Sequence, residues 1–299
     1  MLALMSFALA IAATVLSALF FVGGKVLMAR YQMAWPSLWR WSLLSTGSCG
    51  MLAYLALGAP ALPWWWCLSA GVAGSLAHVC ANQAMSWGDA SLLVPISGAK
   101  PLILVILMPL LMGSALPAHL VNACWLATIG IAITGLAPRR IHRHAPHTTP
   151  AAVLMCLAAV LMAVSDVCGA KGVEGAGAHA HLAAIAMWNA SMGIPPLLAW
   201  WPMRQSESMA NRARAISLGV LFALFIAMLA LAFATATDPS VSVATVNVVV
   251  AFRGVVAVLV VLALDGFLRT GLEPLPRWVH ALRLAGALVL GGAVMLAYL

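Results

Sequence analysis

The chain has 299 residues, of which 64% are hydrophobic and 7% are charged, and its formal net charge is +8. A water-soluble globule of this length needs more charged residues to cover its surface. The composition therefore excludes an ordinary soluble domain. The positive charge does not indicate nucleic-acid binding either, because the basic residues lie in short connections between apolar segments. We therefore expect a membrane-embedded protein with no nucleic-acid partner.

The apolar segments are long enough to form membrane-spanning helices. A bilayer core about 30 Å thick requires ~20 apolar residues per helix. The first charged residue is Lys25, so the opening segment lacks the basic stretch of a signal peptide and is expected to be a retained helix. We predict an all-α integral membrane protein with ten spans, at residues 3–23, 35–57, 62–85, 91–113, 117–137, 151–171, 180–201, 215–236, 241–264 and 279–298.

The basic residues of the connections are unevenly distributed. Apart from Lys171, they all belong to odd-numbered connections or to the helix ends beside them. Positive charge is retained on the cytoplasmic side of membrane proteins. We therefore expect a multi-pass protein of a bacterial inner (plasma) membrane, with both termini on the outer side.

A polar segment at residues 138–150, PRRIHRHAPHTTP, separates the first five predicted spans from the last five. His142, His144 and His147 have no carboxylate or cysteine beside them, so we interpret the segment as a basic cytoplasmic linker and not as a metal site. The predicted organisation is a first five-helix unit at residues 1–137, the linker, and a second five-helix unit at 151–299.

The two predicted units repeat several features. Lys100 in the fourth span corresponds to Arg253 in the ninth, and Lys25 at the end of the first span corresponds to Lys171 at the end of the sixth. Each unit has an odd number of spans, so the two would enter the membrane in opposite orientations, as in the inverted repeats of secondary transporters. Equally spaced glycine pairs also recur in the fifth and tenth spans: Gly130 with Gly135, and Gly286 with Gly291.

Residues 82–135, NQAMSWGDASLLVPISGAKPLILVILMPLLMGSALPAHLVNACWLATIGIAITG, resemble the closing half of an EamA-type repeat of the drug/metabolite transporter superfamily. The similar features are prolines within the fourth span, a corner containing glycine and proline, and a glycine-spaced fifth span. Pro36 followed by Arg40 is similar to the family's second span, whereas Ser114 replaces the family's usual acidic corner residue. The resemblance implies two inverted five-helix bundles, with spans one to four and six to nine around a central cavity and spans five and ten bracing it.

Two basic residues, Lys100 and Arg253, lie inside predicted spans. A charge at the bilayer centre costs about 2.5–3.5 kcal/mol on insertion scales, so such a residue faces a cavity or a partner. Two cations at corresponding positions could bind a carboxylate or phosphate; the alternative is that they pair with acids and hold the bundle together. Asp166 in the sixth span is either their counter-ion, which we favour, or a proton carrier.

Other polar and aromatic residues of the predicted spans complete the candidate site. His78 and Asn82 share one face of the third span, and Ser97 lies one turn before Lys100. Each could contact substrate or make an interhelical hydrogen bond. The predicted substrate-binding residues are Lys100, Arg253, Asn82, Gln83, Ser97, Trp188, Asn189 and Asn247. The predicted charge partners or proton-coupling residues are Asp166, His78 and Arg40.

The sequence contains no pattern of a catalytic triad, a phosphate-binding loop or a nucleotide-binding domain. We therefore expect a protein that is not an enzyme and that uses no cofactor. The predicted function is secondary transport of a small anionic or amphoteric organic metabolite, by an exporter or exchanger that is a monomer or a homodimer. The alternatives are efflux of cationic drugs or amines, flipping of a lipid or lipid-carrier phosphate, and a receptor or assembly role without transport.

Overall fold

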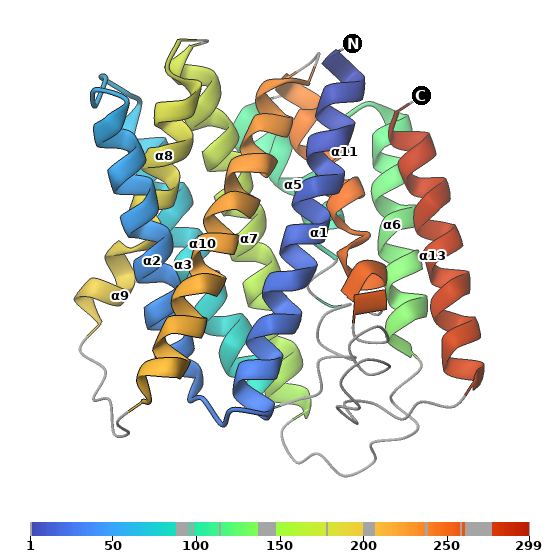
Figure 1. The fold of residues 1–299 in the computed structure, drawn as a ribbon. Helices are drawn as coiled ribbons and strands as arrows, with labels where there is room; N and C mark the ends of the chain where they lie inside the picture. The colour runs from blue at the N-terminus through green and yellow to red at the C-terminus, as the bar shows by residue number, and fades with distance from the viewer. Residues whose placement is uncertain are drawn as a thin grey trace.

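The protein is a bundle of α-helices, and no β-strand occurs among the residues that the structure describes (Figure 1). The structure, a computed structural model, describes residues 2–87, 96, 99–113, 115–136, 148–177, 179–199, 207–236, 239–257, 259–260 and 277–298. Both ends of the chain lie at the same end of the bundle (Figure 1). The all-helical fold class expected from the sequence is therefore confirmed.

The helices follow the apolar segments of the sequence. The first unit contains α1 (Leu2–Ala29), α2 (Trp35–Ala56), α3 (Trp64–Trp87), α5 (Lys100–Met112) and α6 (Ala118–Leu136). The second unit contains α7 (Thr148–Ala176), α8 (His181–Met192), α9 (Ile194–Leu198), α10 (Met209–Ala234), α11 (Pro239–Val250) and α13 (Arg277–Ala297). Residues 138–147 of the proposed linker, with its three histidines, lie outside the described residues.

Two predicted spans are interrupted in the structure. The seventh is divided into α8 and α9 at Gly193, and prolines follow at the first turn of α9, where their missing N–H groups break no helical hydrogen bond. In the ninth, α11 ends at Val250, a turn follows at residues 251–252, and Arg253 begins a new helical stretch. These interruptions differ from the continuous spans that the apolar length alone predicted.

Three helices are long and apolar enough to cross a membrane by length and composition. They contain the segments Leu4–Ala29, Thr149–Ala176 and Met209–Ala234. Four shorter apolar helical segments lie at Lys100–Met112, Ala118–Thr134, Ser242–Ala257 and Ala281–Ala297. The other predicted spans, and ten crossings in total, stay a prediction.

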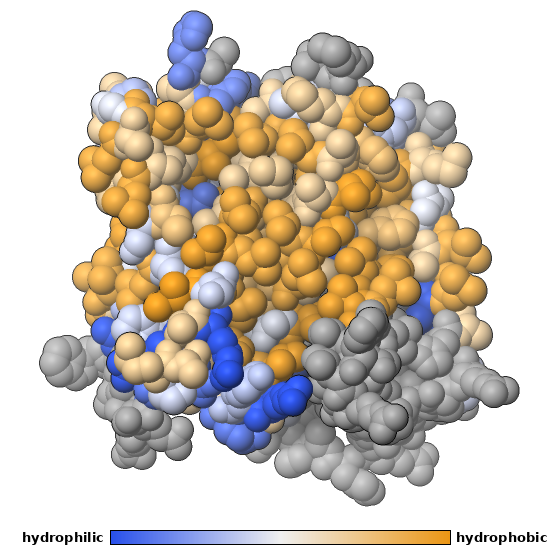
Figure 2. All heavy atoms as spheres, in the orientation of Figure 1, coloured by the Kyte–Doolittle hydropathy of each residue, from blue (hydrophilic) through white to orange (hydrophobic). Residues whose placement is uncertain are grey.

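The surface of the bundle is apolar over much of its height (Figure 2). Large hydrophobic side chains are exposed on several helices; Leu110 and Met295, for example, are 73% and 75% exposed. Hydrophilic residues lie at both ends of the bundle, with the larger group at the end opposite the chain termini (Figures 1 and 2). At that end the exposed Arg30 and Arg214 both lie over the ring of Tyr31, with guanidinium carbons 5.9 and 3.9 Å from its centroid. A water-soluble monomer rarely exposes so much contiguous apolar surface.

The strongest helix contacts join one unit to the other. Helix α1 packs against α10, α3 against α7, α2 against α8, and α6 against α13. Small residues permit these approaches. A Cβ atom added at Gly130 of α6 would lie 2.9 Å from the carbonyl oxygen of Gly286 of α13, and one at Gly47 of α2 would lie 2.7 Å from the Cα of Gly193. The two units are therefore interleaved across most of the bundle.

Candidate functional site

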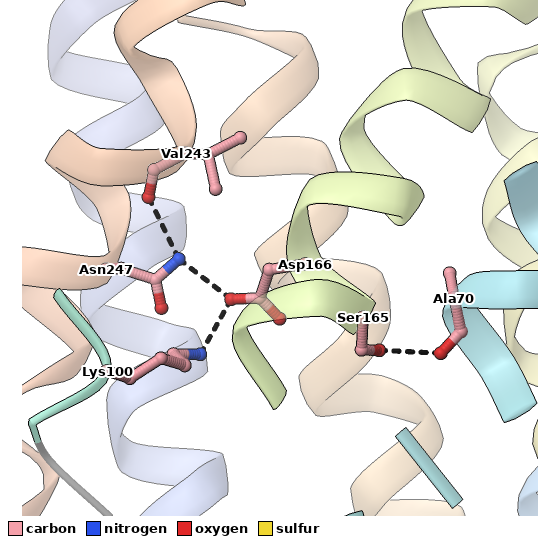
Figure 3. A network of polar contacts seen from close by, with 6 residues as sticks. All are labelled: Ala70, Lys100, Ser165, Asp166, Val243 and Asn247. Atoms are coloured by element: carbon pink, nitrogen blue, oxygen red, sulfur yellow. Dashed lines mark hydrogen bonds and ion pairs between the residues drawn. The ribbon is translucent and has the colours of Figure 1, made fainter. Parts of the chain in front are cut away.

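A buried polar network joins α5, α7 and α11 at the centre of the bundle (Figure 3). Lys100 donates a hydrogen bond from Nζ to Oδ2 of Asp166 at 2.6 Å, which is also an ion pair. Asn247 donates from Nδ2 to the same oxygen at 2.8 Å and to the carbonyl of Val243 at 2.9 Å. All three polar side chains are buried. One carboxylate oxygen thus links one helix of the first unit to two helices of the second.

The local sequence explains where Lys100 is placed. It is the first residue of α5, Ala99 is the N-cap and Pro101 occupies the second position, where proline fits the start of a helix. The amide of Leu102 donates to the Ala99 carbonyl at 3.1 Å. The charged side chain therefore starts at a helix end inside the bundle, not in a connection at its surface.

Arg253 has a similar place in the second unit. At the turn after α11, the amide of Phe252 donates to the carbonyl of Val249, three residues earlier, at 3.0 Å. Arg253 then begins the next helical stretch. Its side chain is buried, and its guanidinium carbon lies 5.2 Å from the ring centroid of Phe21. Lys100 and Arg253 are thus each the first residue of a helical segment.

The two cations and Asp166 line one small cavity. Its volume is about 20 Å³, which is room for about one water molecule. The structure therefore brings together the two residues that the sequence paired by their positions in the repeat. In this conformation the cavity is too small for an organic metabolite, so binding of one would require helices to move. The described residues that line it are Phe21, Gly74, His78, Lys100, Met162, Ser165, Asp166, Met192, Phe222, Phe225, Ile226 and Arg253.

His78 of α3 lies at the cavity among aromatic rings. Its ring centroid is 4.5 Å from that of Phe222 and 5.3 Å from that of Phe20, both edge to face. The side chain is buried, and its Nδ1 has no hydrogen-bond partner among the described residues. His78 therefore borders the ion pair without joining the network of hydrogen bonds around Asp166.

The remaining predicted site residues lie elsewhere. Asn82 is buried and Gln83 half-buried on α3, and neither lines the cavity. Trp188 of α8 is fully buried with its ring against Gly169 of α7, and Asn189 donates to the carbonyl of Ile185 at 3.3 Å. These positions are typical of helix packing. The other two candidates are Arg40, half-buried on α2 and away from the cavity, and Ser97, which lies outside the described residues.

The sequence analysis missed the apolar wall and one polar residue of the cavity. Phe21, Phe222 and Phe225 are ordinary members of apolar helices, so no local signal distinguishes them from packing residues. Ser165 precedes Asp166, and its hydroxyl donates to the carbonyl of Ala70 of α3 at 2.7 Å (Figure 3). The adjacency of Ser165 to the buried acid is the only sequence signal that could have found it.

Comparisons with known proteins show the fold alone. No protein family model and no curated protein matches the chain. A solved structure described only as "Crystal structure of protein" is similar to it with a TM-score of 0.67 and 15% sequence identity, over 98% of this chain and 96% of that one. The protein is thus an all-helical bundle whose architecture occurs in a solved structure and whose centre holds a buried cluster of charges.

Proposed function

We propose that the protein is a membrane-embedded secondary transporter of the EamA type, which moves a small anionic or amphoteric organic metabolite by alternating access. The observation that carries the proposal is that Lys100, Arg253 and Asp166 line the same cavity. Buried ionisable groups within membrane helices usually mark a substrate or ion pathway.

Membrane location is supported by the apolar surface and by the three long apolar helices. The exposed Arg30 and Arg214 lie at the end opposite the termini. Because positive charge stays in the cytoplasm, that end would face the cytoplasm and both termini would lie outside, in the inner membrane of a bacterium.

Inverted repeats are supported by contacts between corresponding parts of the two units. If α1 corresponds to α7, and α3 to α10, then the contacts of α1 with α10 and of α7 with α3 are equivalent. Gly130 and Gly286, paired by their spacing in the sequence, face each other directly. Lys100 and Arg253 each begin a helical segment inside a predicted span, and the segment of Arg253 follows the interruption at residues 251–252. Transporters with inverted repeats bind substrate at such interrupted helices and rock one bundle against the other.

An anionic substrate is favoured by the charges of the cavity. Asp166 already accepts hydrogen bonds from Lys100 and Asn247, so a cationic drug would have to displace a partner of this carboxylate. An anion would instead meet two cationic side chains, one of them an arginine that can bind a carboxylate through two parallel N–H donors.

The test is counterflow into proteoliposomes that contain the purified protein. Labelled organic acids, amino acids, inorganic phosphate and an organic amine would be offered, and fluorescent lipid analogues would be tested for scrambling. We expect counterflow of at least one anion or amino acid and none of the amine. Scrambling of lipids without any counterflow would instead identify a flippase and overturn the proposal.

Variants of the ion pair connect the activity to the site. Lys100→Met should abolish counterflow, and the double variant Lys100→Met/Asp166→Asn should do the same without leaving either member of the ion pair buried and charged without the other. Arg214→Gln, which changes an exposed arginine far from the cavity, is the matched control and should transport normally. Unchanged transport by the folded double variant would contradict the proposed site.

A further inference from the structure

We propose that the crossing of α2 and α10 is a binding site for an anionic phospholipid of the cytoplasmic leaflet. The lipid phosphate is bound by Arg212, which lies beside the ring of Trp41, and one acyl chain runs along an apolar row of α10. This inference rests on the membrane location and orientation within the proposed function, and not on transport. The lipid is a bound partner of the protein surface and does not cross the membrane.

Helices α2 and α10 pack against each other, and both begin at the end opposite the chain termini (Figure 1). The hydroxyl of Ser45 donates to the carbonyl of Ile216 at 3.0 Å, and the hydroxyl of Thr46 donates to the carbonyl of Gly219 at 2.8 Å. These hydrogen bonds fix the height of one helix relative to the other. They also engage both hydroxyl protons, so a ligand at the crossing must be bound by other groups.

Trp41 and Arg212 lie one helical turn nearer to that end. Trp41 precedes Ser45 by four residues on α2, and Arg212 precedes Ile216 by four residues on α10. The guanidinium carbon of Arg212 is 5.5 Å from the centroid of the Trp41 ring, and both side chains are half-buried. The indole packs against a small buried cluster, which consists of Leu27, Met33, Leu38 and Ala215. A tryptophan fixed beside a cation near the start of a helix is typical of the headgroup level of a membrane.

The nitrogen atoms of Arg212 and Trp41 can donate to a phosphate. Nε of Arg212 and Nε1 of Trp41 are buried, and neither has a hydrogen-bond partner among the described residues. Glu207, an acid at the same end, instead accepts a hydrogen bond from the amide of Ala34 at 3.4 Å. Rotation of the long arginine side chain toward the membrane presents Nε and a terminal nitrogen side by side, which is the geometry that binds two oxygens of one phosphate.

An exposed apolar row continues along α10 from Arg212 toward the middle of the bundle. Ile216, Val220 and Leu224 follow at intervals of four residues and are 40%, 41% and 49% exposed. Residues four apart lie on the same face of a helix. At 1.5 Å per residue, the row ends about 18 Å from Arg212, which is close to half of a bilayer core about 30 Å thick. A lipid whose phosphate lies at Arg212 therefore places an acyl chain along this row.

The position of the guanidinium favours an anionic headgroup over a zwitterionic one. In phosphatidylcholine the ammonium group lies within a few bonds of the phosphate, so binding the phosphate brings a second cation close to Arg212. In phosphatidylglycerol the same place holds hydroxyl groups, and the headgroup carries one net negative charge. Basic residues at the headgroup level attract such lipids. We therefore expect selectivity for phosphatidylglycerol.

The first test is native mass spectrometry of the purified full-length protein in detergent, with dioleoylphosphatidylglycerol or dioleoylphosphatidylcholine added at equal concentrations. We expect the first phosphatidylglycerol to bind at least about fivefold more tightly than the first phosphatidylcholine. Arg212→Gln should weaken phosphatidylglycerol binding about fivefold. Arg214→Gln is the matched control, because it removes the same charge from an exposed place on the same helix, and it should change binding by less than about twofold.

Arg212→Lys keeps the charge but not the paired donors, and it should weaken binding about threefold. This variant tests the site even if Arg212→Gln does not fold. Equal binding of the two lipids, or equal effects of substitutions at Arg212 and Arg214, would overturn the proposed site.

The apolar row is tested by Val220→Ser. Val160→Ser is the matched control, because Val160 is 39% exposed on α7 at a similar distance from the start of its helix. We expect about twofold weaker phosphatidylglycerol binding for the first variant only. Glycerol 1-phosphate and inorganic phosphate, which lack acyl chains, should not compete at about a hundredfold excess. Competition by either would identify a site for soluble anions and overturn the assignment to a lipid.

The lipid site and the proposed function can fail separately, because lipid binding is measured without a transported substrate. Selective phosphatidylglycerol binding by a protein that shows no counterflow of any panel compound would refute transport and support the site. Counterflow by a protein without this lipid selectivity would refute the site alone. Scrambling of phosphatidylglycerol that is lost in Arg212→Gln would show that the lipid is cargo, which would overturn both proposals.

Discussion

The centre of the bundle and the α6–α13 edge are both built from residues that correspond in the predicted repeat, but they use opposite chemistry. At the edge, Gly130 and Gly286 bring two helices together through backbone contact, beside a small core of aliphatic residues from α6, α11 and α13. At the centre, Lys100 and Arg253 meet around one carboxylate and a cavity. Close backbone packing permits little change of geometry, whereas hydrogen bonds and ion pairs can exchange partners. We therefore expect substitutions at the edge to change stability alone, and substitutions at the centre to change both stability and the proposed transport.

The largest expected effect comes from removing the central carboxylate. Asp166→Ala leaves Lys100 buried without its partner at 2.6 Å and should lower the free energy of unfolding by about 3–5 kcal/mol. Denaturant titration of the purified protein in detergent measures this loss. The double variant Lys100→Met/Asp166→Asn should recover most of the stability and none of the transport, and failure to recover stability would place the role of Asp166 outside this ion pair.

A smaller effect is expected at the edge. Gly286→Ala adds a Cβ atom 2.6 Å from the carbonyl oxygen of Gly130, so the helices must separate, at a cost of about 1–3 kcal/mol. Gly292→Ala on the same helix is the matched control, because no atom lies within 4 Å of the added Cβ. We expect lower thermal stability for the first variant only, with the transport rate per folded molecule unchanged in both. If Gly286→Ala also lowered the transport rate per folded molecule, the edge would contribute to transport as well as to stability, which would contradict this expectation.

The smallest effect is expected for a charge at the polar end. Arg214 is exposed, and its guanidinium carbon lies 3.9 Å from the centroid of the Tyr31 ring. Exposed cation–π contacts contribute about 0.5–1 kcal/mol, so Arg214→Gln should change the unfolding free energy by no more than about that amount. Its counterflow should match the unchanged protein, which would show that position in the cavity, and not charge alone, is what transport requires.

The sequence predicted much of the helical arrangement, because the length of an apolar segment and the glycine, proline and charged residues that end it are local signals. It also singled out Lys100, Arg253, Asp166 and Asn247, since buried charges and amides stand out in apolar helices. The favoured counter-ion role of Asp166 agrees with its geometry, because it pairs with Lys100 and accepts from Asn247.

The parts that were missed depend on tertiary contacts. Phe222 lines the cavity, whereas Phe233 on the same helix does not, and nothing in their local sequences separates them. The central place of Trp188 in a span predicts a site residue, yet its ring packs against Gly169 of the neighbouring helix. Gly193 and the nearby Pro195 and Pro196 are a local signal for the division of the seventh span. The length of the whole apolar segment instead favoured one continuous helix.

The unequal lining of the cavity has a consequence for how such a protein can arise. If two identical subunits enclosed a cavity about a two-fold axis, every lining side chain away from that axis would occur twice. Here Asp166 lines the cavity, and the residue related to it by the offset between Lys25 and Lys171 is Phe20, which is absent from the described lining. Joining both units in one chain frees each position from its counterpart. That freedom permits an acid at the cavity in one unit and a buried phenylalanine at the corresponding position of the other.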